Sequence, residues 1–237
     1  MSPRRGGFRL GADRRPPRLV LLPGIEGNAR VFTGQVELAA RRPTAALHLP
    51  DAPSIPALAE AVSAILPDAP VVLFGASLGG LVGWSLSLTD PRVAGLITLG
   101  TLPNPNLAPR RIAPARSLLR QLPQPVFRRL YRRRIASRMT EECVPEGVQS
   151  RLLADLPSRD TLCQRLDAIT TWTPSAPPPV PTLWLRGQVD QEIAWDSTTV
   201  QAHLPSVGIE VVPGGHRAHL THPRALNAVI EHFLRSL

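Results

Sequence analysis

The chain has 237 residues, 43% of them hydrophobic, which is enough for one sizeable core and unlike a disordered chain. No apolar run approaches the roughly 18 residues that a membrane-spanning helix needs. The net charge is +9, and every basic residue is arginine, a bias typical of a GC-rich genome. Because the chain has only one Tyr and five Phe and no recognised binding module, we expect no nucleic-acid partner. The two cysteines, Cys143 and Cys163, exclude a disulfide framework, allow one bridge and favour a cytoplasmic location.

Apolar runs alternate with helical patterns in the first hundred residues, which predicts a mostly parallel sheet flanked by crossover helices. Residues 1–17 are basic and rich in proline, and they predict a flexible tail or, alternatively, an organelle-targeting leader. Helices are expected from Ser54 and over about 77–89. Strands are expected at 18–22, 44–49, 70–74 and 93–99.

The alternation stops after the fourth of these strands. Residues 101–172 contain several apolar stripes at helical spacing and predict three or four helices without a strand. Residues 173–181, with five prolines, predict a stiff extended return. Strands at 182–185 and 209–212 and a helix from Pro223 complete the pattern. The sequence therefore predicts a single α/β domain over 18–237, with a helical cap inserted at about 104–172.

Ser77 is the candidate nucleophile. It lies in Gly75-Ala-Ser-Leu-Gly79, between an apolar strand and a helix, and flanking glycines permit a tight turn that projects a serine hydroxyl. A serine needs a base, a group that orients the base, and donors for the oxyanion. The alternative is a glycine-rich turn whose serine only caps the helix.

His216 is the candidate general base because it directly follows the last expected strand. His219 and His222 are rivals a few residues away, and we expect them on the surface or packed against the cap. The three histidines also suggest a metal, but no H-E-x-x-H motif or nearby cysteine accompanies them. We therefore expect no metal and no cofactor.

Asp190 is the candidate acid that orients the base. It follows the strand at 182–185 and therefore lies at the same carboxyl-terminal edge of a parallel sheet. Glu192 is the nearest substitute, and a simple turn-capping aspartate is the alternative. The segment after the strand at 93–99 is neutral, so it offers no competing acid.

Pro23-Gly-Ile-Glu-Gly-Asn28 follows the first strong strand and can turn backbone N–H groups toward the same site. The expected oxyanion donors are the N–H groups of Ile25 and Leu78. Glu26 is unusual there, because a carboxylate opposes a developing oxyanion. It either points away or binds a polar group of the substrate.

These motifs occur in the order Ser, Asp, His, and from about residue 18 onwards the chain resembles the α/β-hydrolase family, with the cap unmatched. The resemblance implies that Ser77, Asp190 and His216 form a catalytic triad, with Ile25 and Leu78 as oxyanion donors. Pro23 stands where many members have histidine. Residues 1–17 do not fully supply the antiparallel hairpin that often begins the sheet.

The resemblance implies a serine hydrolase that cleaves a small-molecule carboxylic ester or thioester through an acyl-enzyme. An acyltransferase of the same chemistry and a catalytically idle binding protein are the alternatives. The complete set of triad residues argues against the idle protein. Neither the acyl group nor the oligomeric state is indicated.

The expected cap carries six arginines within residues 128–138, beside apolar residues that can bury one helix face. Because caps of this family overhang the nucleophile, we expect Arg129, Arg132 and Arg133 to line the entrance. They would attract a coenzyme A conjugate, an acidic carrier or an anionic membrane surface. The alternative is a solvated basic face.

Overall fold

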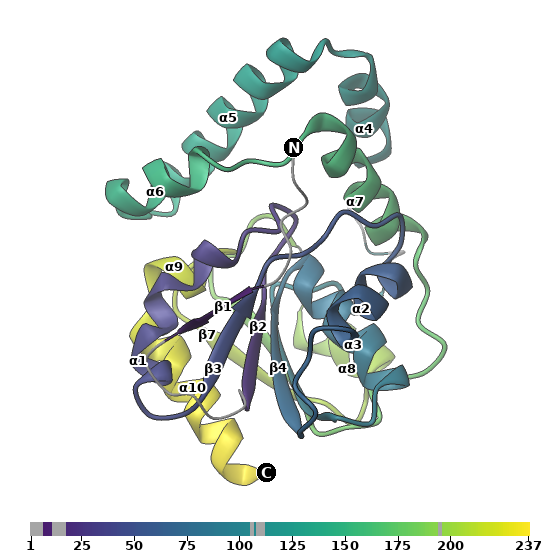
Figure 1. Cartoon of the computed structure of the whole chain (residues 1–237), viewed down its shortest axis with the longest axis vertical. Helices are drawn as coiled ribbons and strands as arrows, with labels where there is room; N and C mark the ends of the chain where they lie inside the picture. Colours follow the sequence, from purple (N-terminus) through teal and green to yellow (C-terminus); the bar gives the residue numbers. More distant parts are fainter. Residues whose placement is uncertain (1–6, 11–17, 105–106, 108–111, 194–195) are drawn as a thin grey trace.

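The computed structural model describes residues 7–10, 18–104, 107, 112–193 and 196–237. These residues form a seven-stranded sheet in the order β1-β3-β2-β4-β5-β6-β7, in which only β1 runs antiparallel to its neighbour (Figure 1). The expected mostly parallel α/β fold is confirmed. The strands are β1 (Gly7–Leu10), β2 (Leu19–Leu22), β3 (Thr44–Leu47), β4 (Val71–Ala76), β5 (Val93–Leu99), β6 (Thr182–Gly187) and β7 (Gly208–Val212).

Strand β1 lies inside the segment that we expected to be a flexible tail. Its residues pair with β3, Phe8 opposite Ala46, while residues 1–6 and 11–17 lie outside the described residues. Edge pairing uses backbone N–H and C=O groups, so it needs no apolar pattern in the added strand. The polar, proline-rich composition of residues 1–17 therefore did not reveal the strand that pairs at this edge of the sheet.

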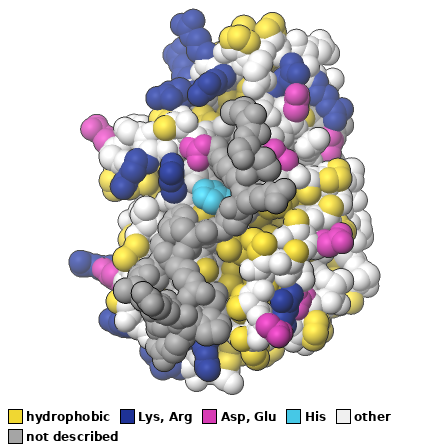
Figure 2. Space-filling view, viewed as in Figure 1, with side chains coloured by type: hydrophobic (Ala, Val, Ile, Leu, Met, Phe, Trp, Pro, Cys, Tyr) yellow, Lys and Arg dark blue, Asp and Glu magenta, His cyan; other side chains and the backbone are white. Residues whose placement is uncertain are grey.

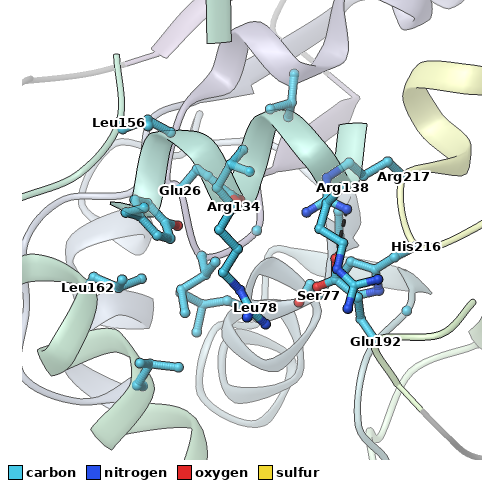
Figure 3. Close-up of a pocket in the computed structure, with 18 of the residues that line it drawn as sticks. Glu26, Ser77, Leu78, Arg134, Arg138, Leu156, Leu162, Glu192, His216 and Arg217 are labelled. Carbon is cyan, nitrogen blue, oxygen red and sulfur yellow. Dashed lines mark hydrogen bonds and ion pairs between the residues drawn. The ribbon is translucent and has the colours of Figure 1, made fainter. Parts of the chain in front are cut away.

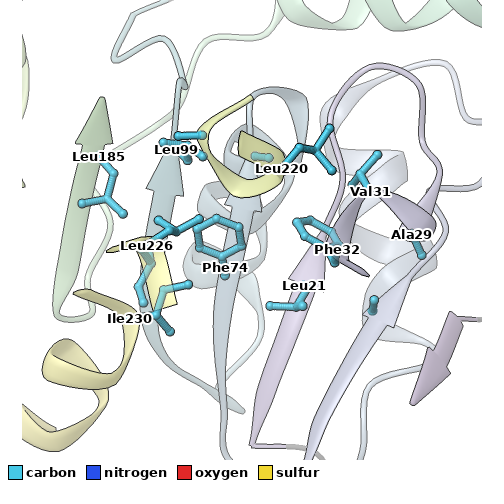
Figure 4. Packing of buried hydrophobic residues seen from close by; sticks show 14 of the residues in the cluster. Leu21, Ala29, Val31, Phe32, Phe74, Leu99, Leu185, Leu220, Leu226 and Ile230 are labelled. Atoms are coloured by element: carbon cyan, nitrogen blue, oxygen red, sulfur yellow. The ribbon is translucent and has the colours of Figure 1, made fainter. Parts of the chain in front are cut away.

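The central strands are apolar on both faces because helices cover both sides of the sheet. Successive side chains alternate, so Leu21 joins one core cluster, with Phe32 and Phe74, whereas Val20 joins the other, with Leu73 (Figure 4). The first cluster also holds residues of η1 (Ala29–Gln35), α1 (Val36–Ala39), α9 (Ala218–Thr221) and α10 (Pro223–Ser236). The second holds residues of α2 (Ile55–Ser63), α3 (Leu78–Thr89) and α8 (Ser197–His203).

Helices α4 (Ile112–Gln121), α5 (Gln124–Glu141), α6 (Glu146–Leu153) and α7 (Arg159–Thr171) follow β5 and precede β6. We call them the helical segment. Because β5 and β6 are hydrogen-bonded neighbours, the segment is an excursion from the sheet, and Figure 1 shows it over one end of the strands. Within the described part of the chain, no helix combines the length and apolar character needed to cross a membrane.

Candidate active site

The strand order brings the expected site residues to one edge of the sheet. Strands β2 and β4 are parallel neighbours, whereas β3 lies on the far side of β2, so the chain changes direction between them. Ligands of open α/β sheets bind at such a switch point, beyond the carboxyl ends of the strands. The loop beginning at Pro23 follows β2, and Ser77 follows β4. Asp190 and His216 follow β6 and β7 at the same edge.

Ser77 occupies a sharp turn between β4 and α3. Its φ of 52° and ψ of −114° are unfavourable for a residue with a side chain, and backbone strain of this kind is common at functional turns. The Ser77 N–H donates to the Leu99 carbonyl at 2.7 Å, and a side chain at Gly75 would collide with the Gly79 backbone. The Ser77 side chain makes no capping hydrogen bond to α3, so the helix-cap alternative is wrong.

His216 and Asp190 form a buried hydrogen-bonded pair. The distance from His216 Nδ1 to Asp190 Oδ2 is 2.9 Å, and their side chains are 11% and 0% exposed. Asp190 Oδ1 accepts hydrogen bonds from the N–H groups of Glu192 and Ile193, at 2.8 and 3.1 Å. Asp190 thus also caps its turn, so the turn interpretation and the pairing with His216 both hold.

The pair is electrostatically matched. Burial would raise the pKa of Asp190, but the hydrogen bond and charge of His216 and the two backbone donors lower that pKa below its ordinary value. Burial would lower the pKa of His216, yet Asp190 and Glu192 raise it above 6.5. An ionised Asp190 holds the proton on His216 Nδ1 and leaves Nε2 as the acceptor.

The two rival histidines differ from His216. His219 is 6% exposed and packs against Phe32, with ring centroids 5.6 Å apart, and burial lowers its pKa to about 3. His219 is therefore a core residue at the cavity wall. The expectation that it lies on the surface or packs against the cap was wrong. His222 is exposed and directly precedes α10.

The loop after β2 is held by an arginine that sequence patterns did not single out. Arg165 of α7 is 3% exposed, and its guanidinium donates to the carbonyls of Ile25 at 2.8 Å and Leu49 at 3.0 Å. This fixes the peptide that follows Ile25, and a side chain at Gly27 would collide with Arg165. Leu78 is the first residue of α3, where a helical N–H has no intrahelical partner.

A second buried arginine, Arg217, connects the helical segment to the loops that carry Asp190 and His216. The Arg217 guanidinium contacts Glu142, which follows α5, and Glu192 at 2.8 Å, and the Arg217 N–H donates to Glu142 Oε2 at 2.8 Å. Burial would lower the pKa of Arg217, but the surrounding carboxylates raise it. Glu192, expected only as a substitute for Asp190, serves this ion pair.

A cavity of about 560 Å³ lies between this edge and the helical segment. Ser77, His216, Ile25, Leu78 and Glu26 line one side of it, and Figure 3 shows where Glu26, Ser77, Leu78 and His216 lie around the cavity. The opposite wall is mostly apolar and comes from all four helices of the segment. An apolar wall facing a nucleophile and base suits an acyl chain.

Comparison with known proteins identifies the family of this chain. The model of the alpha/beta hydrolase family matches residues 8–229. The chain belongs to this family.

Two relatives of this hydrolase are named pimeloyl-[acyl-carrier protein] methyl ester esterase. The one from Aeromonas hydrophila subsp. hydrophila is 29% identical over 260 residues, which cover 92% of this chain and 95% of the relative. The one from Xylella fastidiosa (strain M12) is 26% identical, with 93% and 96% covered.

Solved structures share the fold of this hydrolase. A hydrolase from Pseudomonas aeruginosa PA01 gives a TM-score of 0.80 at 20% identity, covering 96% of this chain and 93% of that one. The enol-lactonase from Burkholderia xenovorans LB400 gives 0.77 at 16% identity, with 99% of each chain covered.

The arginines of this hydrolase that reach the cavity are not those expected from its sequence. Arg129, Arg132 and Arg133 are exposed and do not line the cavity, whereas Arg134 and Arg138 do. Helical spacing explains the difference, because residues 131, 134, 135 and 138 share one face of α5. Figure 3 shows Arg134 and Arg138 pointing toward the side that holds Ser77. In Figure 2, other arginines gather at the top of the molecule, where Figure 1 has α4 and α5.

Among the described residues, no group of three or more His, Cys, Asp or Glu side chains could hold a metal ion. Cys143 is exposed and Cys163 is buried, and both are free thiols.

Proposed function

We propose that this protein is a serine hydrolase that cleaves a carboxylic ester through an acyl-enzyme on Ser77. The observation that carries the proposal is the 2.9 Å hydrogen bond between His216 and buried Asp190, beside a serine held in a strained turn. The esterase names of the relatives support an ester substrate.

In the first step, Ser77 Oγ attacks the carbonyl carbon of the ester, and its proton passes to His216 Nε2. Asp190 stabilises the imidazolium that results. The Ile25 and Leu78 N–H groups, at the same cavity wall, donate to the oxyanion. When the tetrahedral intermediate collapses, the C–O bond breaks, and the leaving alcohol takes the proton from His216.

In the second step, water attacks the acyl-enzyme while His216 again accepts a proton. Collapse of this intermediate returns the proton to Ser77 Oγ, and a carboxylic acid is released. No cofactor enters either step. An acyltransferase would differ only in using an alcohol or amine in place of water.

The proposed function also assigns a role to each segment of the chain. We propose that β1 and residues 18–237 act as one domain, with residues 104–172 as a cap and 173–181 as its return. The free thiols of Cys143 and Cys163 support a reducing, cytoplasmic location.

A screen of esters tests the proposed reaction. Methyl esters and matching thioesters of increasing acyl length are incubated with the wild type and with Ser77→Ala, with and without an added alcohol. Hydrolysis by the wild type alone supports the proposal, and transfer to the alcohol in preference to water would favour the acyltransferase. Equal turnover by both proteins would contradict it.

The proposed substrate is carried by an acidic partner, such as an acyl carrier protein or coenzyme A. Arg134 and Arg138 at the cavity support an anionic part of the substrate, and the relatives are named for a methyl ester whose acyl part is bound to a carrier protein. Arg134→Gln with Arg138→Gln should lower kcat/KM for an acyl-coenzyme A more than for a neutral ester, by about tenfold at low salt.

The matched control replaces Arg129, Arg132 and Arg133, which we first expected at the entrance, with Gln. A smaller effect in this triple variant supports the cavity arginines. A larger effect would return the role to the exposed face of α5.

A further inference from the structure

Tyr131 is an uncharged polar group on the face of α5 that lines the cavity, which also carries Arg134 and Arg138. It is the only tyrosine of the chain, it is 8% exposed, and its hydroxyl is buried without a hydrogen-bond partner in the described structure. Its ring stacks on Phe127, with centroids 5.4 Å apart, so α5 packing holds the ring in place. A buried hydroxyl without a partner is costly, which makes it a candidate for contact with a ligand.

Glu26 lies on the opposite wall, one residue after the expected oxyanion donor Ile25. Glu26 Oε2 and Ser77 Cβ each lie 3.5 Å from the point where a Cβ on Gly24 would stand, so the carboxylate is close to the nucleophile. Left alone, this negative charge would oppose an oxyanion at Ser77. A group that donates a hydrogen bond to Glu26 would offset the opposition.

Glu26 and Tyr131 both line the cavity, and the charge of Glu26 acts on the Tyr131 hydroxyl. Burial raises the pKa of the Tyr131 hydroxyl well above its ordinary value, and the Glu26 carboxylate raises it further. Arg217 and Arg165 act in the opposite direction on the same hydroxyl. Tyr131 therefore remains a neutral donor and acceptor within the electrostatic reach of a carboxylate and two cations.

On the basis of the proposed ester hydrolysis, we propose that Glu26 and Tyr131 form a subsite for a substrate hydroxyl close to the scissile ester bond. Such a hydroxyl donates to Glu26 and accepts from Tyr131, which satisfies both groups at once. A carboxylate would be repelled by Glu26. An ammonium group would meet the positive charges of Arg217, Arg165 and Arg134. A neutral hydroxyl is the group that fits both the donor and the acceptor.

Matched ester pairs test the subsite. Methyl esters of 2-hydroxy and 3-hydroxy acids are compared with unsubstituted acids of the same length, and glycol esters are compared with simple alkyl esters. Wild-type kcat/KM should be at least about tenfold higher for one hydroxylated member, as expected for a hydrogen bond to a charged group.

Two variants test whether the preference for a hydroxylated ester depends on Tyr131 and Glu26. Tyr131→Phe and Glu26→Met should each bring the ratio of kcat/KM within a pair close to one, whatever their effect on the unsubstituted ester. Glu26→Gln keeps the size and polarity of the side chain and should retain part of the preference, so it serves if Glu26→Met does not fold. Glu60→Gln, on the exposed side of α2, is the control and should keep the wild-type ratio.

The outcomes separate this inference from the proposed function. Ser77-dependent hydrolysis with no preference for any hydroxylated ester, or with a preference that Tyr131→Phe and Glu26→Met leave intact, would overturn the subsite alone. Turnover that survives Ser77→Ala would overturn the proposed reaction as well.

Discussion

The carboxyl-terminal edge of the sheet and the helical segment α4–α7 contribute to the same cavity by different means. At the edge, backbone geometry holds each group: Ser77 sits in a strained turn, and Asp190 is fixed by two N–H donors. In the segment, amphipathic helices supply side chains, and two buried arginines, Arg165 and Arg217, connect it to the loops of the edge.

This difference separates chemistry from selectivity. Substitutions of Ser77, Asp190 or His216 at the sheet edge should change the rate on every substrate, because these are the proposed reacting groups. Substitutions in the helical segment should change which substrate is preferred, or how firmly the segment is attached. The predictions below test that division.

The largest effect is expected at Ser77. Ser77→Ala should lower kcat on the order of 10⁶-fold, by analogy with serine enzymes whose nucleophile was removed, and abolish labelling by a fluorophosphonate. Ser85→Ala, a buried serine on the same helix, is the matched control and should keep both properties. Persistent labelling of Ser77→Ala would show that another residue is the nucleophile.

Substitutions of His216 and His219 should differ almost as strongly in their effect on activity. His216→Ala should lose nearly all turnover, because the base is gone. His219→Phe keeps a ring against Phe32 and should reduce kcat/KM only slightly. Steady-state kinetics on one ester measures both. A dead His219 variant beside an active His216 variant would reverse the assignment.

The pH profile should show the raised pKa of His216. The base acts in its neutral form, and its pKa is raised above 6.5, so kcat/KM should fall as the pH drops through a midpoint above 6.5. Below that midpoint the loss approaches tenfold per pH unit. Glu192→Gln removes one of the charges that raise this pKa, so it should move the midpoint downward.

Glu60→Gln is the control for that shift, because Glu60 is an exposed residue of α2. A wild-type midpoint below 6.5 would mean that burial outweighs the carboxylates around His216.

The smallest effect concerns the attachment of the helical segment. Glu142→Gln removes a carboxylate that accepts from both the backbone and the guanidinium of Arg217, and it should destabilise the protein by about 2 kcal/mol. Glu141→Gln, next to it in the chain, affects only exposed interactions, the ion pair with Arg138 and a hydrogen bond from Ser137, and should cost less than about 1 kcal/mol. Urea unfolding measures both. Equal losses would indicate that the Arg217 link does not hold the segment.

Much of the fold followed from local sequence because a parallel sheet covered on both faces needs continuous apolar strands. The strand at 93–99 was predicted with the bounds it has, and Ser54 caps α2 as expected, since its side chain accepts from the Ala57 N–H. The sequence did not reveal the short elements η1, α1, α8 and α9, because helices of so few residues show no clear periodicity of apolar residues. Strand β1 was missed because edge pairing depends on the backbone of β3.

The amino-acid sequence by itself determined which residue types follow which strands, and so singled out Ser77, Asp190 and His216 as candidates. Each follows a strand, and parallel strands bring their carboxyl ends together. Only the tertiary structure decided which arginines reach the cavity, that Arg165 and Arg217 hold its loops, and that Tyr131 and Glu26 line the same cavity. Those contacts join residues up to 140 positions apart, and no local pattern encodes the rotation of one helix against a distant loop.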